Sequence, residues 1–192
     1  IGKYNVIYID FSEIPRGCKT YAKYINRIED GILKDLKECY SKLDFEDNIA
    51  LWDAFSQVFD KTKDKFIFVL DEWDALFHIP FVTEADKQEY LSFLKILLKG
   101  QSYVELAYMT GVLPIAKYSD GSELNMFLEY NMATKIRFSE YFGFTEEEVD
   151  NLYETYLQRT KKPRIGRESL REWYDGYHTA GGERLYNPRS VI

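Results

Sequence analysis

Three short apolar runs stand out along the chain, at residues 4–10, 66–70 and 104–109. Each is rich in β-branched or aromatic residues and is bounded by polar ones, which predicts three β-strands. The run at 66–70 is apolar at every position, and this lack of alternation favours a strand that is covered on both faces.

Longer segments show apolar residues at helical spacing. Gly31 is a weak point in the first of them, Thr83 is suited to cap the start of the third, and Gly100 is suited to end it. The pattern predicts helices at residues 19–43, 48–60 and 83–98.

The second half of the chain has weaker patterns and one strong one. A helix is expected at residues 122–130 and a strand at 134–138. Thr145 and Glu148 then form a capping box, which predicts the start of a further helix that Pro163 stops. Glycines and aromatic residues dominate the chain after that point.

Strands that alternate with helices indicate an α/β fold with a mainly parallel sheet. In such sheets the chemistry collects beyond the carboxyl ends of the strands. The residues that follow each apolar run are therefore the first candidates for a functional site.

Two carboxylates, Asp71 and Glu72, follow the run at 66–70, with Asp74 close behind. Adjacent carboxylates at the end of a buried strand are costly unless their charge is compensated. A magnesium–nucleotide complex would compensate it, Asp71 holding the metal through its water shell and Glu72 orienting the attacking water. The simpler alternative is an acidic cluster that caps a following helix, where negative charge suits the helix dipole. For Asp74, a supporting role behind the site and a helix N-cap both stay open.

Thr110 and Gly111 end the run at 104–109. The Thr110 hydroxyl could contact a γ-phosphate or the attacking water, although a Thr that ends a strand before a Gly turn needs no ligand to explain it. Four arginines are candidate phosphate contacts or ordinary surface charges: Arg137, Arg164, Arg167 and Arg171.

Composition narrows the classes of protein. A chain of 192 residues suits one domain, or one domain with a small appendage. A net charge of -7 argues against general binding of nucleic acid. Cys18 and Cys39 fall about six turns apart within one helical pattern and cannot bridge each other if that helix forms, which favours a reducing cytoplasm. No apolar run approaches the roughly 20 residues of a membrane helix, and no signal peptide opens the chain. The two histidines, His78 and His178, are not spaced with a cysteine for zinc.

Seven segments share their order with bacterial AAA-ATPase-like proteins, which often carry a PD-(D/E)XK nuclease-like domain downstream, and the chain resembles that family. The segments are YIDFS at 8–12, LDEWD at 70–74, TGVLPIAK at 110–117, SELN at 122–125, FGFTEEEV at 142–149, WYDGY at 173–177 and YNP at 186–188. Each alone is weak, but the shared order is specific and covers nearly the whole chain.

The resemblance implies a P-loop ATPase core over residues 1–142, with a mainly parallel sheet flanked by helices, and a helical lid-like part over 143–192. It implies that Asp71 and Glu72 are the Walker B acidic motif. Asp71 would bind the metal and, with Thr110, the nucleotide; Glu72 and Thr110 would act in catalysis, Thr110 near the sensor position. The cofactors implied are Mg²⁺ and ATP.

The chain departs from that family at its start. No Gly-x-x-x-x-Gly-Lys-Ser/Thr loop occurs in it, and in the family this loop, with its strand and helix, would lie upstream of Ile1. Backbone amides and the lysine of the loop bind the β- and γ-phosphates. We therefore expect an ATPase fragment that is inactive without the upstream segment. Trp73 is a milder departure, at a position where many members have Tyr.

Two other classes of protein stay open. A non-hydrolysing interaction module would keep the fold without the catalysis. A metal-dependent nuclease would use Asp71, Glu72 and Asp74, but the usual lysine one or two residues after the strand carboxylate is absent. Besides ATP, the resemblance suggests a homo-oligomer or a downstream nuclease-like domain as partners. The cysteines favour a cytoplasmic location, the apolar pattern predicts no membrane segment, and the net charge gives no sign of direct binding of nucleic acid.

Overall fold

The computed structural model describes residues 4–115 and 124–188 of the chain. The chain forms two compact units, Ile1–Phe127 and Leu128–Ile192. The sequence had suggested a division between residues 142 and 143, and the lid-like role of the later part stays a prediction.

The first unit contains a parallel sheet of three strands in the order β1-β2-β3. The strands are β1 (Asn5–Asp10), β2 (Phe66–Asp71) and β3 (Val104–Met109). The expected strands and the central place of β2 are thus confirmed.

Burial along β2 alternates, which corrects one expectation from the sequence. Phe66, Phe68 and Leu70 are at most 1% exposed, whereas Ile67 and Val69 on the other face are only half-buried. Within the described residues, β2 is therefore covered on one face and not on both.

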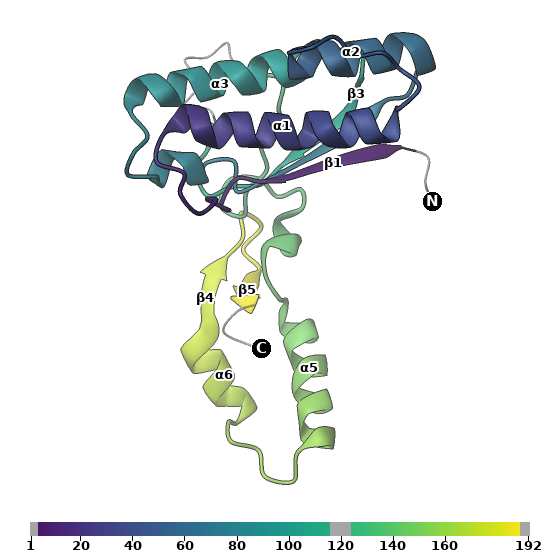
Figure 1. Ribbon diagram of the computed structural model, residues 1–192. Coiled ribbons are helices and arrows are strands. Elements are labelled where there is room, and N and C mark those ends of the chain that lie inside the picture. The colour runs from purple at the N-terminus through teal and green to yellow at the C-terminus, as the bar shows by residue number, and fades with distance from the viewer. Residues whose placement is uncertain (1–3, 116–123, 189–192) are drawn as a thin grey trace. The chain divides into compact units, whose positions relative to one another are not determined.

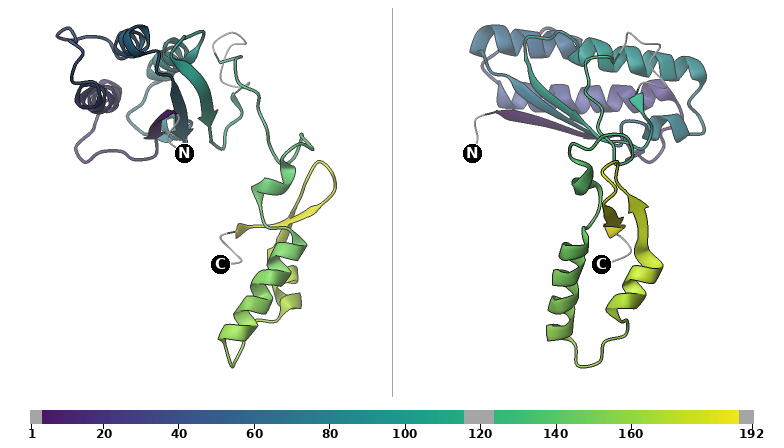
Figure 2. Two further views of the ribbon diagram at one scale, coloured as in Figure 1. Left: turned by 90° about the vertical axis from the view of Figure 1, so that its right-hand side faces the viewer. Right: turned by 180° about the vertical axis from the view of Figure 1, so that it is seen from behind.

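Three helices cover that buried face and lie on the same side of the sheet (Figures 1 and 2). They are α1 (Tyr21–Cys39), α2 (Leu51–Thr62) and α3 (Glu84–Leu98), with a short 3-10 helix, η1 (Ala75–His78), between β2 and α3. Thr83 caps α3 as expected, with a reciprocal bond to Asp86. No helix in the described part of the chain is long and apolar enough to cross a membrane.

The first helix is shorter than its apolar pattern suggested at both ends: Thr20 caps its start, and it ends at Cys39. Cys18 therefore precedes the helix and Cys39 ends it, which corrects the expectation that one helix holds both. Both cysteines are free.

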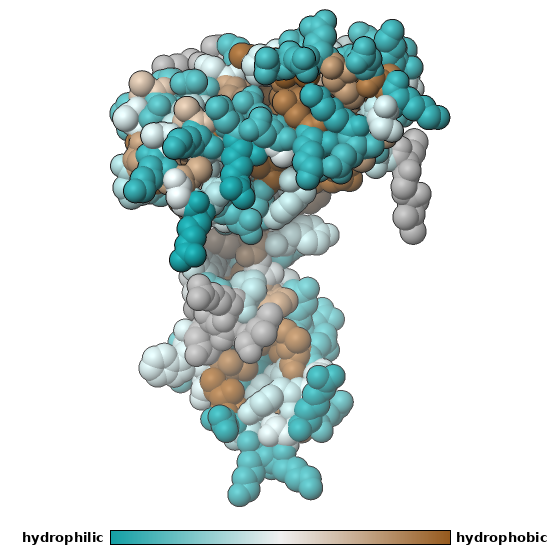
Figure 3. All heavy atoms as spheres, in the orientation of Figure 1, coloured by the Kyte–Doolittle hydropathy of each residue, from teal (hydrophilic) through white to brown (hydrophobic). Residues whose placement is uncertain are grey.

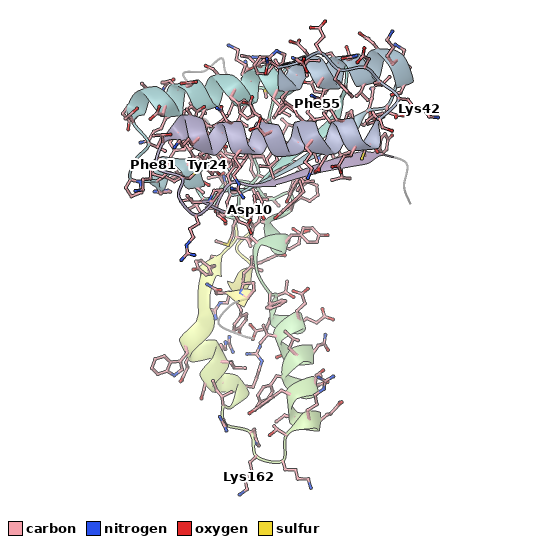
Figure 4. All side chains as sticks on the ribbon, in the orientation of Figure 1. Asp10, Tyr24, Lys42, Phe55, Phe81 and Lys162 are labelled. Carbon is pink, nitrogen blue, oxygen red and sulfur yellow. The ribbon has the colours of Figure 1, made fainter. Side chains whose placement is uncertain are left out.

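The core lies between these helices and the sheet. The ring of Phe55 on α2 meets the rings of Phe66 and Phe68 edge to face, with centroids 4.8 and 5.3 Å away. On α1, the Tyr24 hydroxyl donates to the carbonyl of Phe11, just after β1, over 2.6 Å. Figure 4 labels Tyr24 and Phe55 on their helices. Hydrophilic side chains predominate over the outer sides of the helices (Figure 3).

The opposite face of the sheet carries exposed apolar side chains. In register, Ile67 lies between Val6 and Leu106, and Val69 lies between Tyr8 and Tyr108. The four outer members of these rows are 54–60% exposed: Val6, Tyr8, Leu106 and Tyr108. We call this surface the open face.

The second unit is built from short elements. They are η2 (Ser139–Phe142), α5 (Glu146–Arg159), α6 (Arg167–Tyr174), β4 (Asp175–His178) and β5 (Arg184–Tyr186). The capping box is confirmed: the Thr145 hydroxyl accepts from the Glu148 amide at 3.3 Å, and the Glu148 carboxylate accepts from the Thr145 amide at 2.8 Å. The helix ends at Arg159, ahead of Pro163.

Arg167 joins several elements of this unit. Its guanidinium donates to Asp150 at 2.6 Å and to Glu146 at 3.0 Å on α5. It also donates to the Tyr186 hydroxyl on β5, which itself donates to Glu146. These bonds connect α5, α6 and β5.

Two expected elements are wrong where the structure describes them. Residues 124–130 form turns and irregular chain, and residues 122–123 lie outside the described range. In this irregular chain Leu124 is part of the hydrophobic core, and Met126 and Phe127 pack against it.

The expected strand at 134–138 is a series of turns. The Asn131 side chain accepts from the amides of Ala133 and Thr134, and this favours a turn over a strand. Phe138 then adopts a left-handed backbone, with φ at 68°.

Candidate functional site

Polar residues end all three strands of the sheet at the same edge. Asp10 at the end of β1 is in register with Asp71 at the end of β2. Thr110 directly follows β3, and its amide donates to the carbonyl of Leu70 at 2.9 Å. Figure 4 labels Asp10 at this edge. The edge is the one at which α/β proteins bind ligands.

Hydroxyl groups from both sides hold the Asp71 carboxylate. The Thr110 hydroxyl donates to Oδ1, and the Tyr8 hydroxyl on β1 donates to Oδ2 at 3.0 Å. Both bonds stabilise the charged carboxylate and lower the pKa of Asp71, the Thr110 bond most. The bond to Asp71 also raises the pKa of Tyr8. Asp71 is thus kept ionised and oriented.

The Thr110 hydroxyl has a second bond, accepting from the amide of Glu72 at 3.2 Å. Glu72 has φ at 51°, a left-handed backbone that a residue with a side chain adopts at a cost of about 1 kcal/mol. Its carboxylate is exposed. Because strained residues persist where their surroundings hold them, this geometry adds to the case for a site.

Asp74 has a structural role that the sequence did not distinguish. It is 1% exposed, and its carboxylate accepts from the amides of Val112 at 3.1 Å and Leu113 at 2.7 Å. It occupies the N-cap position of η1, but its side chain makes no cap bond there. Asp74 therefore holds the loop after β3 in place behind the site.

Gly111 is required by the closeness of this packing. A Cβ at Gly111 would lie 2.5 Å from Oδ1 of Asp74 and 2.6 Å from Nε1 of Trp73. Trp73 is itself buried, and its carbonyl accepts from the hydroxyl of Tyr90 at 2.8 Å. Residues 70–74 and 110–111 are thus packed closely against each other, through Trp73, Asp74 and Gly111.

The donor set fits a magnesium ion held through its water shell. Mg²⁺ prefers oxygen ligands, keeps several waters and is bound by one or two carboxylates plus substrate phosphates. Asp71 supplies an ionised carboxylate, and each of its oxygens keeps acceptor capacity beyond its one hydroxyl donor. Within the described residues, no group of three or more His, Cys, Asp or Glu side chains could hold a metal alone.

The four arginines considered for phosphate contact all belong to the second unit. Arg167 is engaged with Asp150 and Glu146, and the guanidinium of Arg137 lies 4.7 Å from the centre of the Phe138 ring. Phosphate contact by any of them stays a prediction.

Sequence reasoning missed Tyr8 as part of the site. Its position two residues before Asp10 puts the two side chains on one face of β1. The contact with Asp71, however, depends on the register of β1 against β2, which no sequence signal gives. A surface pocket on the same unit lies elsewhere, between α1 and the chain before α2, and none of the candidate site residues lines it.

Fold and site together define an α/β protein with an acid–hydroxyl cluster at the carboxyl edge of a parallel sheet. A family model described as "Predicted AAA-ATPase" matches residues 1–119, more than half of the chain. The chain belongs to this AAA-ATPase-like family. The match includes Asp71, Glu72 and Thr110 and ends before the second unit, which holds the four candidate arginines.

Other comparisons add little. No curated protein matches the chain significantly. The Aeropyrum pernix ORC1 protein, in a structure with DNA, is similar at 15% identity and a TM-score of 0.40, over 84% of this chain and 36% of that one. The chain thus spans about a third of that protein, and a TM-score of 0.40 is too low to establish a shared fold.

Proposed function

We propose that this chain is part of an ATP-binding, ATP-hydrolysing P-loop domain with Asp71 and Glu72 as its Walker B acids. The observation that carries the proposal is the Thr110 hydroxyl, which donates to the Asp71 carboxylate and accepts from the Glu72 amide. One hydroxyl thereby links a metal-type acid and a water-orienting acid at the ligand-binding edge of a parallel sheet.

Each residue has a distinct task in this proposal. Asp71, ionised and oriented, would hold the magnesium ion through its water shell, and Thr110 would stand at the sensor position. Glu72, with its exposed carboxylate, would orient and polarise the attacking water. Bound Mg²⁺ neutralises charge that develops on the phosphates.

The open face supports a missing upstream segment. Parallel sheets are normally covered on both faces. The connection from β1 to β2 and the connection from β2 to β3 both cross the sheet in the same direction. Because such crossovers are right-handed, connections in the same direction place their helices on the same face of the sheet. A helix over the open face therefore needs a crossover that steps back across the sheet, and the crossover proposed here runs from an extra strand beside β3 to β1.

That extra strand and helix would precede β1 in the chain. This is the order in which a Walker A strand, loop and helix would enter. Because the strand would be parallel to β3, its loop would lie at the same edge as Asp71 and Thr110. The proposal therefore includes an upstream segment that supplies the phosphate-binding amides and lysine.

The test compares this chain with a protein extended upstream through its Walker A loop. The chain alone should show negligible ATP hydrolysis, because positioning and charge stabilisation supply nearly all catalysis in phosphoryl transfer and half of the site is absent. The extended protein should hydrolyse ATP with Mg²⁺.

Variants of the extended protein separate the two acids. Glu72→Gln should lower turnover about 100-fold or more and leave ATP affinity unchanged, since only water activation is lost. Asp71→Ala should also weaken Mg²⁺-dependent binding. Glu46→Gln, at an exposed position before α2, is the control for loss of an acid. Normal hydrolysis by Glu72→Gln would show that its role is assigned wrongly.

The second candidate function is a non-hydrolysing interaction module. The exposed apolar side chains of the open face favour it, since they could receive a partner protein instead of an upstream helix. Nucleotide binding decides between the two: an extended wild-type protein that binds no ATP would refute the ATPase and leave the interaction module as the favoured function.

A further inference from the structure

Among the described residues, Tyr8 is the one aromatic residue of the open face that hydrogen-bonds to Asp71. Its side chain is 60% exposed, and its hydroxyl lies 3.0 Å from Oδ2 of Asp71. Tyr8 belongs to β1 and Asp71 to β2, so this bond joins two strands at the carboxyl edge of the sheet.

The consequence is a carboxylate held from both flanks. Thr110, after β3, donates to Oδ1, and Tyr8, on β1, donates to Oδ2. Rotation of the carboxylate about its Cβ–Cγ bond would break both hydrogen bonds. Neither hydroxyl is charged, so the acid is oriented while its negative charge stays available to a cation.

We propose that Tyr8 is a positioning residue, which fixes the Asp71 carboxylate in the orientation that receives hydrated magnesium bound to a nucleotide. This inference rests on the proposed function. Partners that orient a metal-binding side chain are typically worth about 10- to 100-fold in metal affinity. Tyr8 acts on the metal only through Asp71, and it is therefore not a catalytic residue.

The alternative is that Tyr8 merely fills the open face, and Tyr108 offers a matched control. Tyr108 lies in the same cross-strand row, on the other side of Val69, and is also 60% exposed. Within the described residues its hydroxyl makes no hydrogen bond. Tyr8→Phe and Tyr108→Phe thus remove the same atom from the same face, but only the first breaks a bond to Asp71.

The first experiment uses this chain and needs no nucleotide. Thermal unfolding is compared for Tyr8→Phe, Asp71→Ala and the double variant. Tyr8→Phe should lower the midpoint by about 2 °C alone and not at all beside Asp71→Ala, because the bond is then already lost. Equal effects in the two backgrounds would show that the contact does not form, and would overturn the inference.

The second experiment uses the protein extended upstream through its Walker A loop. Affinity for a fluorescent ATP analogue is measured across a Mg²⁺ titration and in excess EDTA. Tyr8→Phe should weaken Mg²⁺-dependent binding about 10-fold and leave binding in EDTA unchanged, whereas Tyr108→Phe should change neither. Equal affinities for the two variants across the titration would overturn the inference.

Failure of the proposed function gives a different result. In that case the extended wild-type protein binds no nucleotide, with or without Mg²⁺, while the unfolding experiment still detects the coupling of Tyr8 to Asp71. The metal-positioning role then falls with the function. When the extended wild type binds nucleotide, the contrast between Tyr8→Phe and Tyr108→Phe tests Tyr8 alone.

Discussion

The two faces of the sheet are made by alternate residues of the same strands, yet they differ in how far they are buried. On the helix-covered face, Phe66, Phe68 and Leu70 are at most 1% exposed. On the open face, Tyr8 and Tyr108 are both 60% exposed. Because the backbone is shared, the difference comes from what lies over each face.

This contrast separates stability from function within one sheet. The covered face buries the apolar surface that folding of the first unit requires. On the open face, the Tyr8 hydroxyl donates a hydrogen bond to Asp71, so that this face contacts the candidate site directly. The open face is thus the part of the unit where a further segment or a partner would change both packing and activity.

The largest expected effect contrasts neighbours on opposite faces of β2. Phe68→Ala should lower the free energy of unfolding by about 3–5 kcal/mol, because it leaves a cavity beneath Phe55. Val69→Ala, one residue along on the half-buried side, should cost about 1 kcal/mol. Urea unfolding in a Trp173→Phe background reports the first unit alone through Trp52 and Trp73. Equal losses for the two variants would refute the contrast between the faces.

The next largest effect lies at the carboxyl edge. Gly111→Ala should destabilise by about 1–3 kcal/mol, since the new methyl group meets Trp73 and Asp74. Gly31→Ala in α1 is the control, because nothing lies within 4 Å of a Cβ there and alanine favours a helix interior by about 1 kcal/mol. The two changes should therefore have opposite signs in the same unfolding assay. A gain in stability for both would mean that the packing around Gly111 is looser than described.

Much of the first unit could be predicted from the sequence, because its signals are local. The strand β3 begins and ends where its apolar run does, and Thr83 caps α3 through a contact three residues long. The order of the strands agrees with the tendency of consecutive strands to lie side by side. Burial on only one face of β2 could not be predicted, because an unbroken apolar run fits two covered faces as well as one.

The acidic residues of the candidate site could be predicted from the sequence, but the hydrogen bonds that they make could not. Asp71 ends β2, Glu72 follows it and Thr110 follows β3, and these positions alone mark the three residues. The left-handed backbone of Glu72 and the bond from Tyr8 depend on register and on packing across strands. In the second unit, Arg167 bonds to a residue 21 positions away. Local sequence patterns therefore gave no signal for the contacts of Arg167.

The second unit extends the comparison to a helix with little burial. Val149 is the one buried residue described in α5, so its capping box should carry more of its stability than caps do in the covering helices. Thr145→Ala should cost about 1 kcal/mol of the second unit's stability, whereas Thr145→Ser keeps the oxygen and should cost less. Trp173 fluorescence in a Trp52→Phe, Trp73→Phe background follows this unit. An unchanged unfolding midpoint for Thr145→Ala would show that the cap is not formed.

A smaller effect tests strain at the site. Glu72→Gly should stabilise the chain by about 0.5 kcal/mol, because relief of a left-handed backbone outweighs the added entropy of the unfolded chain. It should also abolish turnover in the extended protein. Lys63→Gly, at the left-handed C-cap of α2, should stabilise similarly with turnover unchanged. A loss of stability on Glu72→Gly alone would mean that the glutamate side chain holds the turn.

The smallest effect expected in this chain is the one that could overturn the comparison of faces. Leu106 on the open face is 54% exposed, so Leu106→Lys should change the free energy of unfolding by no more than about 0.5 kcal/mol. In the extended protein the same change should cost about 2 kcal/mol or more, because a covering helix would bury Leu106 and a lysine there would lose its water. Leu157→Lys on α5, at a side chain 43% exposed, controls for the added charge and should be near neutral in both proteins.

A large loss for Leu106→Lys in this chain would mean that another part of the chain already covers the open face. A neutral result in both proteins would leave that face free in the extended protein, and would remove the support that it gives to an upstream strand and helix.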